Sequence, residues 1–293
     1  LHVMGLEAMG AKFELSKEGI RATAKELRGA SIELKFPSVG ATENLMMAAT
    51  LAKGTTVIDN AAREPEIEDL AAFLVGMGAD VSGAGGSTIT IEGVERLHPV
   101  EHTVVPDRIE AATFALAAAA TKGEVTIKGA RPDHMTAVLE KMREAGVKME
   151  RDGSNLTIKK GGRLKPIDVT TLPYPGFPTD VQAQFMVLNV LAEGDSEIIA
   201  TIFENRLMHV LELQRMGASI NLDKNTAYVK GVRKLSAAPV MATDLRASAA
   251  LVLAGLAAKG ETIIDRIYHI DRGYEEIDQK LFQLGAKVLR LDS

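Results

Sequence analysis

Apolar and polar positions along the chain follow a pattern that returns several times. A helix-like apolar run ends in a glycine turn and continues into a short strand-like segment five times. Glycine is favoured directly after a helix because it adopts the left-handed backbone conformation without steric cost. The five segments are LEAMGAKFEL, LVGMGADVSG, KMREAGVKME, LQRMGASINL and LFQLGAKVLR, with turn glycines Gly10, Gly78, Gly146, Gly217 and Gly285.

A second pattern alternates with the first. It consists of a helix rich in Ala and Leu, a glycine and a β-branched strand, and the turn glycines are Gly54, Gly123, Gly194 and Gly260. These helices are apolar on all faces, which predicts that they are buried. Together the two patterns predict repeated βαβαββ units, each with a strand, a helix, a strand, a helix and two strands. Alternating strands and helices indicate an α/β fold with some parallel pairing.

The count of repeats predicts two domains, for which 293 residues are ample. We predict an incomplete first domain over residues 1–105 and a nearly complete second domain over residues 106–293, with the segment RLHPVEHTVVPD at the crossover. The segment around Gly10 has only the second helix of a unit, so the pattern begins in the middle of a repeat. This start predicts that the chain lacks an N-terminal part.

Composition excludes several classes of function. The chain is 46% hydrophobic and 25% charged, which is typical of globular proteins and not of disordered ones. A net charge of −5, few aromatic residues and no Trp argue against nucleic acid as a partner. No apolar run approaches the roughly 18 residues of a membrane span, so we expect no membrane association. The absence of Cys excludes disulfides and thiol nucleophiles, and the six His show no metal spacing, so we expect no metal and no cofactor.

Charged residues gather in the loops that enter the predicted helices. Each residue alone has an ordinary explanation, since Asp commonly caps a helix and Arg commonly forms a surface ion pair. Their recurrence instead favours an anionic, phosphate-bearing ligand, because helix N-termini and Arg side chains both bind anions. The residues in or near N-cap positions are Ser38, Asp107, Asp180 and Asp244, and the loop cations are Arg63, Arg131, Arg206 and Arg272.

Six of these segments together resemble the UDP-N-acetylglucosamine enolpyruvyl transferases. They are PSVGATENLMMAATLAKGTTVIDNAAREPEI, PDRIEAATF, FPTDVQAQF, FENRLMHV, MATDLRASAALVLAGL and DRIYHIDRGYE, in the order of the family. The resemblance implies an inside-out α/β barrel with two domains of three βαβαββ units each. It also implies a cytoplasmic enzyme of peptidoglycan precursor synthesis that uses no cofactor. Such an enzyme moves the enolpyruvyl group of phosphoenolpyruvate to the 3-hydroxyl of UDP-N-acetylglucosamine and releases phosphate.

The resemblance also implies roles for particular residues. Asp180, Asp244 and Arg272 correspond to catalytic residues. Asp180 would contact the sugar 3-hydroxyl and accept its proton, Arg272 would bind phosphate, and Asp244 and Arg246 would line the same site. The implied substrate-binding residues are Leu1, Phe36, Pro37, Ser38, Val39, Gly40, Glu64, Asp107, Thr179, Asp180, Ile202, Phe203, Arg246 and Arg272. Some members of the family have Lys where Phe36 stands, so one diphosphate contact is expected to be missing.

Two alternatives remain at this point. The shikimate enolpyruvyl transferases share the fold and the phosphoenolpyruvate donor, although the segments NAAREPEI and YHIDRGYE argue against them. The chain could also be a non-catalytic fragment. In the family, a Lys–Asn pair that binds phosphoenolpyruvate and a loop proton donor precede the position of Leu1. We therefore expect this chain on its own to be catalytically silent.

Overall fold

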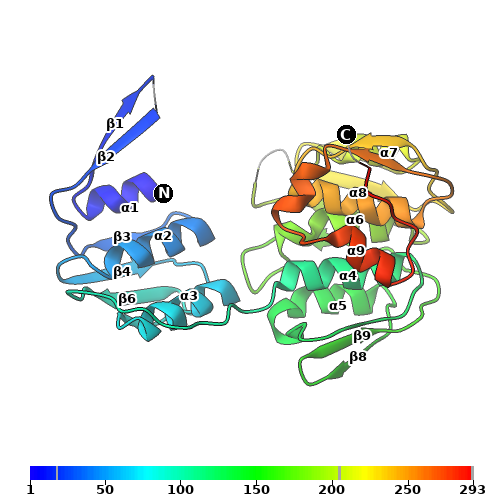
Figure 1. Cartoon of the computed structure of the whole chain (residues 1–293). Helices are drawn as coiled ribbons and strands as arrows, with labels where there is room; N and C mark the ends of the chain where they lie inside the picture. The colour runs from blue at the N-terminus through cyan, green and yellow to red at the C-terminus, as the bar shows by residue number, and fades with distance from the viewer. Residues whose placement is uncertain (18, 204–205, 292–293) are drawn as a thin grey trace. The chain divides into compact units, whose positions relative to one another are not determined.

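The computed structural model describes residues 1–17, 19–203 and 206–291. It divides into two compact units, Leu1–Val105 and Pro106–Ser293, which we call unit 1 and unit 2 (Figure 1). Each unit has its own hydrophobic core. No helix in these described ranges is long and apolar enough to cross a bilayer.

Unit 1 contains a hairpin and one complete repeat. The hairpin strands β1 and β2 pair only with each other, and the repeat forms a four-stranded sheet of order β3-β4-β6-β5. Strand β3 is parallel to β4, and the other pairs are antiparallel. The elements are α1 (His2–Ala8), β1 (Lys12–Ser16), β2 (Gly19–Thr23), β3 (Ser31–Glu33), α2 (Val39–Ala49), β4 (Thr55–Asp59), α3 (Pro65–Gly76), β5 (Asp80–Ser82) and β6 (Thr88–Glu92). From β3 to β6 the order is the predicted βαβαββ.

Unit 2 continues the same pattern through three sheets. Their orders are β7-β9-β8, β10-β11-β13-β12 and β14-β15, so the second sheet repeats the topology found in unit 1. The elements up to α6 are α4 (Arg108–Ala120), β7 (Val125–Ile127), η1 (Pro132–Met135), α5 (Thr136–Glu144), β8 (Met149–Asp152), β9 (Asn155–Ile158), β10 (Val169–Thr170), η2 (Thr179–Val181) and α6 (Gln182–Val190).

The second half of unit 2 carries the remaining elements. They are β11 (Asp195–Ile199), α7 (Val210–Arg215), β12 (Ser219–Asp223), β13 (Thr226–Lys230), β14 (Pro239–Met241), α8 (Leu245–Ala257), β15 (Ile263–Asp265), η3 (Ile267–Arg272) and α9 (Ile277–Gln283). One prediction is wrong here, because the segment after Gly285 does not form a strand. A strand requires a neighbouring strand for its backbone hydrogen bonds, and the described part of the chain offers none to residues 286–291.

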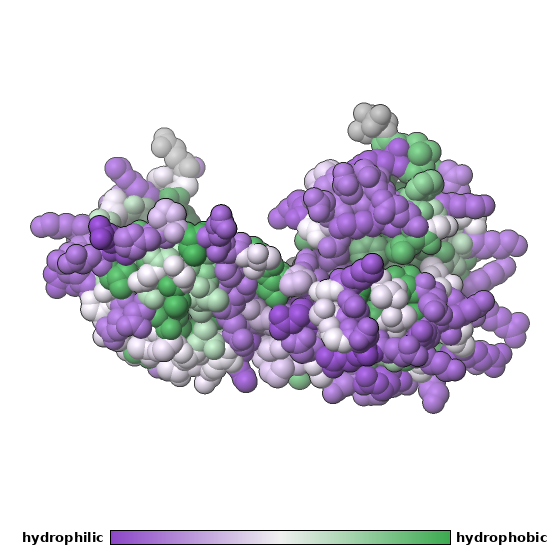
Figure 2. All heavy atoms as spheres, turned by 60° about the horizontal axis from the view of Figure 1, so that its bottom comes forward, coloured by the Kyte–Doolittle hydropathy of each residue, from purple (hydrophilic) through white to green (hydrophobic). Residues whose placement is uncertain are grey.

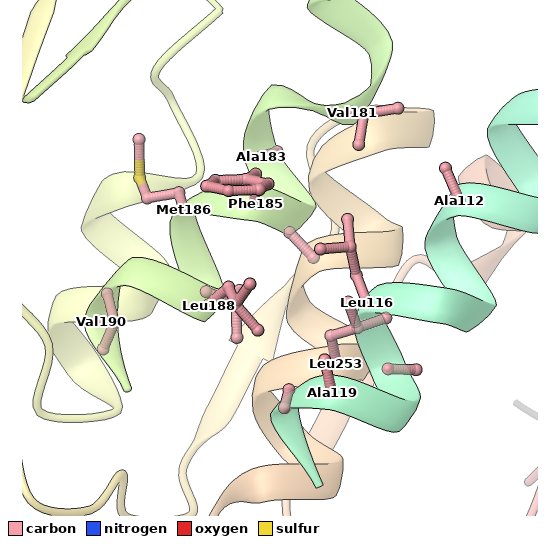
Figure 3. Packing of buried hydrophobic residues seen from close by; sticks show 14 of the residues in the cluster. Ala112, Leu116, Ala119, Val181, Ala183, Phe185, Met186, Leu188, Val190 and Leu253 are labelled. Atoms are coloured by element: carbon pink, nitrogen blue, oxygen red, sulfur yellow. The ribbon is translucent and has the colours of Figure 1, made fainter. Parts of the chain in front are cut away.

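The core of unit 2 is built on three helices that pack against one another. Helices α4, α6 and α8 are in mutual contact, and their small and branched side chains interdigitate (Figure 3). Leu116 of α4, Leu188 of α6 and Leu253 of α8 are all buried in the same cluster. Small side chains such as Ala112 and Ala119 of α4 let the helices approach closely. The prediction that the Ala/Leu-rich helices are buried is confirmed for α4, α6 and α8, whereas α2 leaves Met47 49% exposed.

On the face that Figure 2 shows, hydrophilic side chains predominate over unit 2, whereas neutral and hydrophobic residues gather over the middle of unit 1. Leu15 on β1 and Leu289 near the C-terminus are 86% and 80% exposed. Neither belongs to a hydrophobic core. The hairpin β1–β2 therefore contributes little to the core of unit 1, whereas Ala286 and Val288 of the C-terminal segment pack against a small buried cluster of unit 2.

Candidate active site

Three of the four residues predicted in or near N-cap positions cap a helix in the structure. Ser38, Asp107 and Asp244 are the N-cap residues of α2, α4 and α8, respectively. Their side-chain oxygens accept hydrogen bonds from backbone N–H groups of the first turn over 2.7 to 3.4 Å. These bonds satisfy donors that would otherwise lack a partner. All three residues therefore have a structural role, whatever else they do.

Asp180 does not cap a helix, and the expectation of a cap is wrong for this residue. The turn η2 precedes α6, its N-cap residue is Pro178, and neither η2 nor α6 has a side-chain cap. Asp180 therefore lies inside the turn η2, and its carboxylate does not bind the backbone N–H groups of the helix and can contact other side chains. The carboxylate lies between two guanidinium groups, with Oδ1 at 3.5 Å from Arg206 Nη1 and Oδ2 at 3.3 Å from Arg246 Nη2.

Arg246 is the more enclosed of these two cations. It lies in the first turn of α8, and its side chain is 17% exposed. Burial opposes its charge, but Asp180 and Tyr274 outweigh that effect and raise the pKa of Arg246. Its guanidinium lies 5.9 Å from the centre of the Tyr274 ring, and Nη1 is 3.5 Å from the Tyr274 hydroxyl. Arg246 is therefore held as a cation beside Asp180.

Arg206 approaches Asp180 from the loop before α7. Its guanidinium lies 4.7 Å from the centre of the Phe203 ring, and Phe203 itself is about half exposed. Residues 204–205 of the FENR motif lie outside the described residues. Sequence reasoning identified Arg206 as a loop cation but did not place it in the site. The only indication in the sequence that Arg206 could belong to the site is that arginines recur in the corresponding loops.

One carboxylate between two guanidinium groups leaves one positive charge unbalanced. Such a site attracts an anion, and guanidinium groups bind phosphate and carboxylate in bidentate geometry. The Asp180 side chain is 36% exposed, so a substrate hydroxyl can reach it. The arrangement thus combines a proton acceptor with cations that can stabilise developing negative charge.

Arg272 and Thr179 belong to the same unit but are not bonded to this cluster. Arg272 ends η3, which packs on α8, and its side chain is exposed. It forms no ion pair or hydrogen bond with any residue in the described ranges. The hydroxyl of Thr179 is buried and likewise finds no hydrogen-bond partner among the described residues. Of the two groups, only the exposed guanidinium of Arg272 is open to a ligand.

Comparison with known proteins shows the family of the chain. The sequence profile of EPSP synthase (3-phosphoshikimate 1-carboxyvinyltransferase) matches residues 1–281. The chain belongs to this carboxyvinyltransferase family.

Two relatives define the branch of the family more narrowly. The chain is 56% identical over 292 residues to a UDP-N-acetylglucosamine 1-carboxyvinyltransferase of Thermodesulfovibrio yellowstonii, covering 99% of this chain and 70% of that protein. It is 57% identical over 295 residues to the enzyme of the same name from Actinobacillus pleuropneumoniae, covering 100% of this chain and 70% of that protein. The resemblance predicted from the motifs is confirmed.

Solved structures agree with the predicted fold. The enolpyruvyl transferase NikO from Streptomyces tendae superimposes with a TM-score of 0.90 at 26% identity, covering 98% of this chain and 71% of that one. EPSP synthase from Acinetobacter baumannii shares the fold with a TM-score of 0.73 at 20% identity, covering 98% of this chain and 70% of that one. The fold class, an inside-out α/β barrel of βαβαββ units, is confirmed.

In this transferase the predicted residues of unit 1 lie at the N-termini of three helices. Phe36, Pro37, Ser38, Val39 and Gly40 form the entry to α2, and Val39 is its first residue. Glu64 is the N-cap residue of α3, without a side-chain cap, and its carboxylate accepts a hydrogen bond from the backbone N–H of Arg63 at 3.0 Å. Leu1 is the N-cap residue of α1 and is 40% exposed.

The remaining loop arginine of unit 2 has a local partner. Arg131 pairs with Asp133 at 2.8 Å, and this bond lowers the pKa of Asp133 to about 2. The contact spans two residues on the surface, so the ordinary explanation of a surface ion pair is sufficient for Arg131. The presence of Arg in a loop that enters a helix is therefore not enough to identify that residue as part of the site.

His209 is a buried group of the transferase that sequence reasoning set aside as a hydrogen-bonding residue. Its ring is 2% exposed, and its Nε2 has no hydrogen-bond partner in the described part of the chain. Burial lowers the pKa of His209 to about 4, against an opposing effect of the Asp244 charge. The imidazole is therefore neutral near pH 7.

Proposed function

We propose that this transferase moves the enolpyruvyl group of phosphoenolpyruvate to the 3-hydroxyl of UDP-N-acetylglucosamine and releases phosphate. The observation that carries the proposal is the 56% identity, over 99% of the chain, to a protein named for that reaction. We assign the reaction to peptidoglycan precursor synthesis in the cytoplasm. The shikimate-type alternative has weaker support, because the EPSP synthase of Acinetobacter baumannii is only 20% identical.

Asp180 is the proposed general base. Its carboxylate accepts the proton of the sugar 3-hydroxyl as that oxygen bonds to C2 of phosphoenolpyruvate. The support is its position, since it is partly exposed, caps no helix and is oriented by two guanidinium groups. A carboxylate within reach of a substrate hydroxyl can accept its proton as the oxygen attacks.

Cations of unit 2 are the proposed phosphate and adduct ligands. Arg246 balances charge as the tetrahedral adduct forms and collapses, and Arg272 binds the phosphate that leaves. Asp244 lies two residues before Arg246, and we propose that it takes part in proton transfer. Its Oδ1 already accepts two backbone hydrogen bonds of 2.9 Å. Its second oxygen is then the one available to a substrate.

The nucleotide sugar is the proposed ligand of the other predicted residues. Val39 and Gly40 present backbone amides of the α2 N-terminus to the diphosphate, because N–H groups there lack helical partners. Ser38 lies beside them, and its own N–H already donates to the Phe36 carbonyl at 2.8 Å. The remaining contacts to sugar and uridine come from Leu1, Phe36, Pro37, Glu64, Asp107, Thr179, Ile202 and Phe203. Phe36 supplies an apolar contact where some relatives have a charged Lys.

Calorimetry with two ligands tests the proposal without requiring turnover. We expect the chain to bind UDP-N-acetylglucosamine and to bind shikimate 3-phosphate at least tenfold more weakly. Asp180→Asn should weaken the binding of the nucleotide sugar, whereas Asp223→Asn, a change at an exposed position on β12, should not. Preference for shikimate 3-phosphate would establish the alternative activity, and binding of neither ligand would count against nucleotide-sugar recognition by this chain.

A further inference from the structure

Three buried polar side chains join α4, α6 and the segment between η3 and α9 beside the proposed active site. They are Thr113, Gln184 and Tyr274, and each is at most 2% exposed. The Thr113 and Tyr274 oxygens are 2.9 Å apart, and Gln184 Nε2 lies 3.1 Å from the first and 3.3 Å from the second. A buried polar network of this kind costs stability unless its bonds are made, so its presence calls for an explanation.

The direction of each hydrogen bond follows from groups that can only accept. The Thr113 hydroxyl is 2.8 Å from the backbone carbonyl of Ile109, so its single proton points there. Thr113 must then accept from Tyr274, which makes the tyrosine hydroxyl the donor in that bond. The lone pairs of the Tyr274 oxygen are thereby left to face other donors.

Gln184 and Arg246 supply those donors. The Gln184 amide nitrogen is 3.0 Å from the backbone carbonyl of Asp180, which can only accept, so the amide orientation is determined. Arg246 Nη1 faces the Tyr274 oxygen at 3.5 Å, while its Nη2 faces Asp180 at 3.3 Å. One guanidinium is thus held between a tyrosine oxygen and the proposed base.

We infer that Tyr274 is a positioning residue: its hydroxyl, oriented by Thr113, holds the Arg246 guanidinium against Asp180 in the geometry that binds substrate. The expected effect on substrate binding rests on the proposed function, whereas the contacts among Thr113, Tyr274 and Arg246 are independent of it. Gln184 supports the same arrangement from the other side by fixing the backbone of Asp180. Two helices, α4 and α6, and the segment after η3 are therefore coupled to one ion pair.

Matched variants separate this role from simple packing. Tyr274→Phe removes the acceptor for Arg246 and keeps the ring. Thr113→Val removes the acceptor for the tyrosine proton and keeps the shape, whereas Thr113→Ser keeps the hydroxyl. Tyr228→Phe, on the exposed face of β13, is the control for loss of a tyrosine hydroxyl.

The first measurement is the NMR signature of the Arg246 guanidinium, assigned by its loss in Arg246→Lys. We expect slow hydrogen exchange of its N–H groups in the wild type, Thr113→Ser and Tyr228→Phe. We expect at least tenfold faster exchange in Tyr274→Phe and Thr113→Val. Unchanged exchange in folded Tyr274→Phe, with its melting temperature recorded alongside, would overturn the inference.

The second measurement is the affinity for UDP-N-acetylglucosamine. We expect about a tenfold loss in Tyr274→Phe and Thr113→Val, since a hydrogen bond to a charged group is involved, and less than a twofold change in Thr113→Ser. Equal affinities in Tyr274→Phe and wild type would overturn the substrate-binding part of the inference. If the wild type binds no nucleotide sugar while exchange responds as expected, the proposed function fails and the positioning of Arg246 stands.

Discussion

Individual residues of the same type have different roles in this transferase because their local turns differ. Asp107 and Asp244 cap helices, whereas the 3₁₀ turn η2 moves Asp180 away from the cap position and toward Arg206 and Arg246. The sequence PTD resembles ATD closely, and nothing in the residue types alone separates them. The partners of the side chain, rather than its position relative to the helix, identify Asp180 as the proposed base.

Asp180→Asn should therefore affect catalysis far more than stability. The side chain is 36% exposed, and exposed ion pairs contribute about 0–1 kcal/mol. Loss of a general base costs roughly 10²–10⁴ in rate. We expect phosphate release in an active transferase that contains this chain to fall by that factor, with a change of under about 1 kcal/mol in the free energy of unfolding. Unchanged turnover with a lowered melting temperature would show a structural role instead.

His209 should make the stability of unit 2 depend on pH. Its pKa is about 4 in the folded protein and near 6.5 in the unfolded chain. Between these values the unfolded state binds more protons, so stability is present above pH 6.5 and is lost as the pH falls toward 4. The loss amounts to about 3 kcal/mol.

Urea unfolding at several pH values measures this contribution. All four tyrosines lie in unit 2 and the chain has no Trp, so tyrosine fluorescence follows that unit. His209→Gln should remove the extra loss of stability between pH 6.5 and 4, and His98→Gln in unit 1 should leave the fluorescence curves unchanged. An identical pH dependence in wild type and His209→Gln would contradict the prediction.

Elements of the fold are joined at close backbone contacts that recur from repeat to repeat. Gly93 follows β6 and donates its N–H to the Gly54 carbonyl at 3.1 Å, and Gly231 follows β13 and donates to Gly194 at 2.8 Å. A Cβ at Gly231 would collide with the carbonyl of Ala192, and one at Gly93 would collide with that of Ala52. These glycines let the last strand of a repeat pass the turn after its buried helix.

Gly231→Ala should therefore destabilise unit 2 by about 2 kcal/mol or more, since backbone must shift to admit the methyl group. Gly162→Ala is the matched control, because its Cβ would meet no atom within 4 Å. The control should be neutral or slightly stabilising. Tyrosine fluorescence in urea gives both values, and equal midpoints for the two variants would show that the contact is not close in solution.

At the scale of the whole molecule, the described residues form three hydrophobic clusters that share no buried residue, one in unit 1 and two in unit 2. Ile58 is fully buried in the core of unit 1, and Leu251 is fully buried in that of unit 2. The compact units that contain them meet in sequence between Val105 and Pro106. The predicted completeness of each domain, incomplete before residue 106 and nearly complete after it, remains a prediction.

Separate cores should give separable unfolding. Ile58→Ala should cost unit 1 about 2–5 kcal/mol and shift the transition detected by far-UV circular dichroism, while the tyrosine-detected midpoint stays constant. Leu251→Ala should shift the tyrosine-detected midpoint by a comparable free energy. An equal shift of the tyrosine signal in Ile58→Ala would show that the two units unfold as one.

The sequence alone determined the α/β class, the repeat and the burial of the Ala/Leu-rich helices, because these depend on local periodicity and on glycine turns. It also determined the family, since the loop motifs are local stretches of sequence. Only the tertiary structure decided which charged residues meet. The pairing of Asp180 with Arg206 and Arg246, and the contact of Tyr274 with Thr113, join residues 26, 66 and 161 positions apart. The missing strand after Gly285 has the same cause, because a strand depends on a partner that its own residues do not specify.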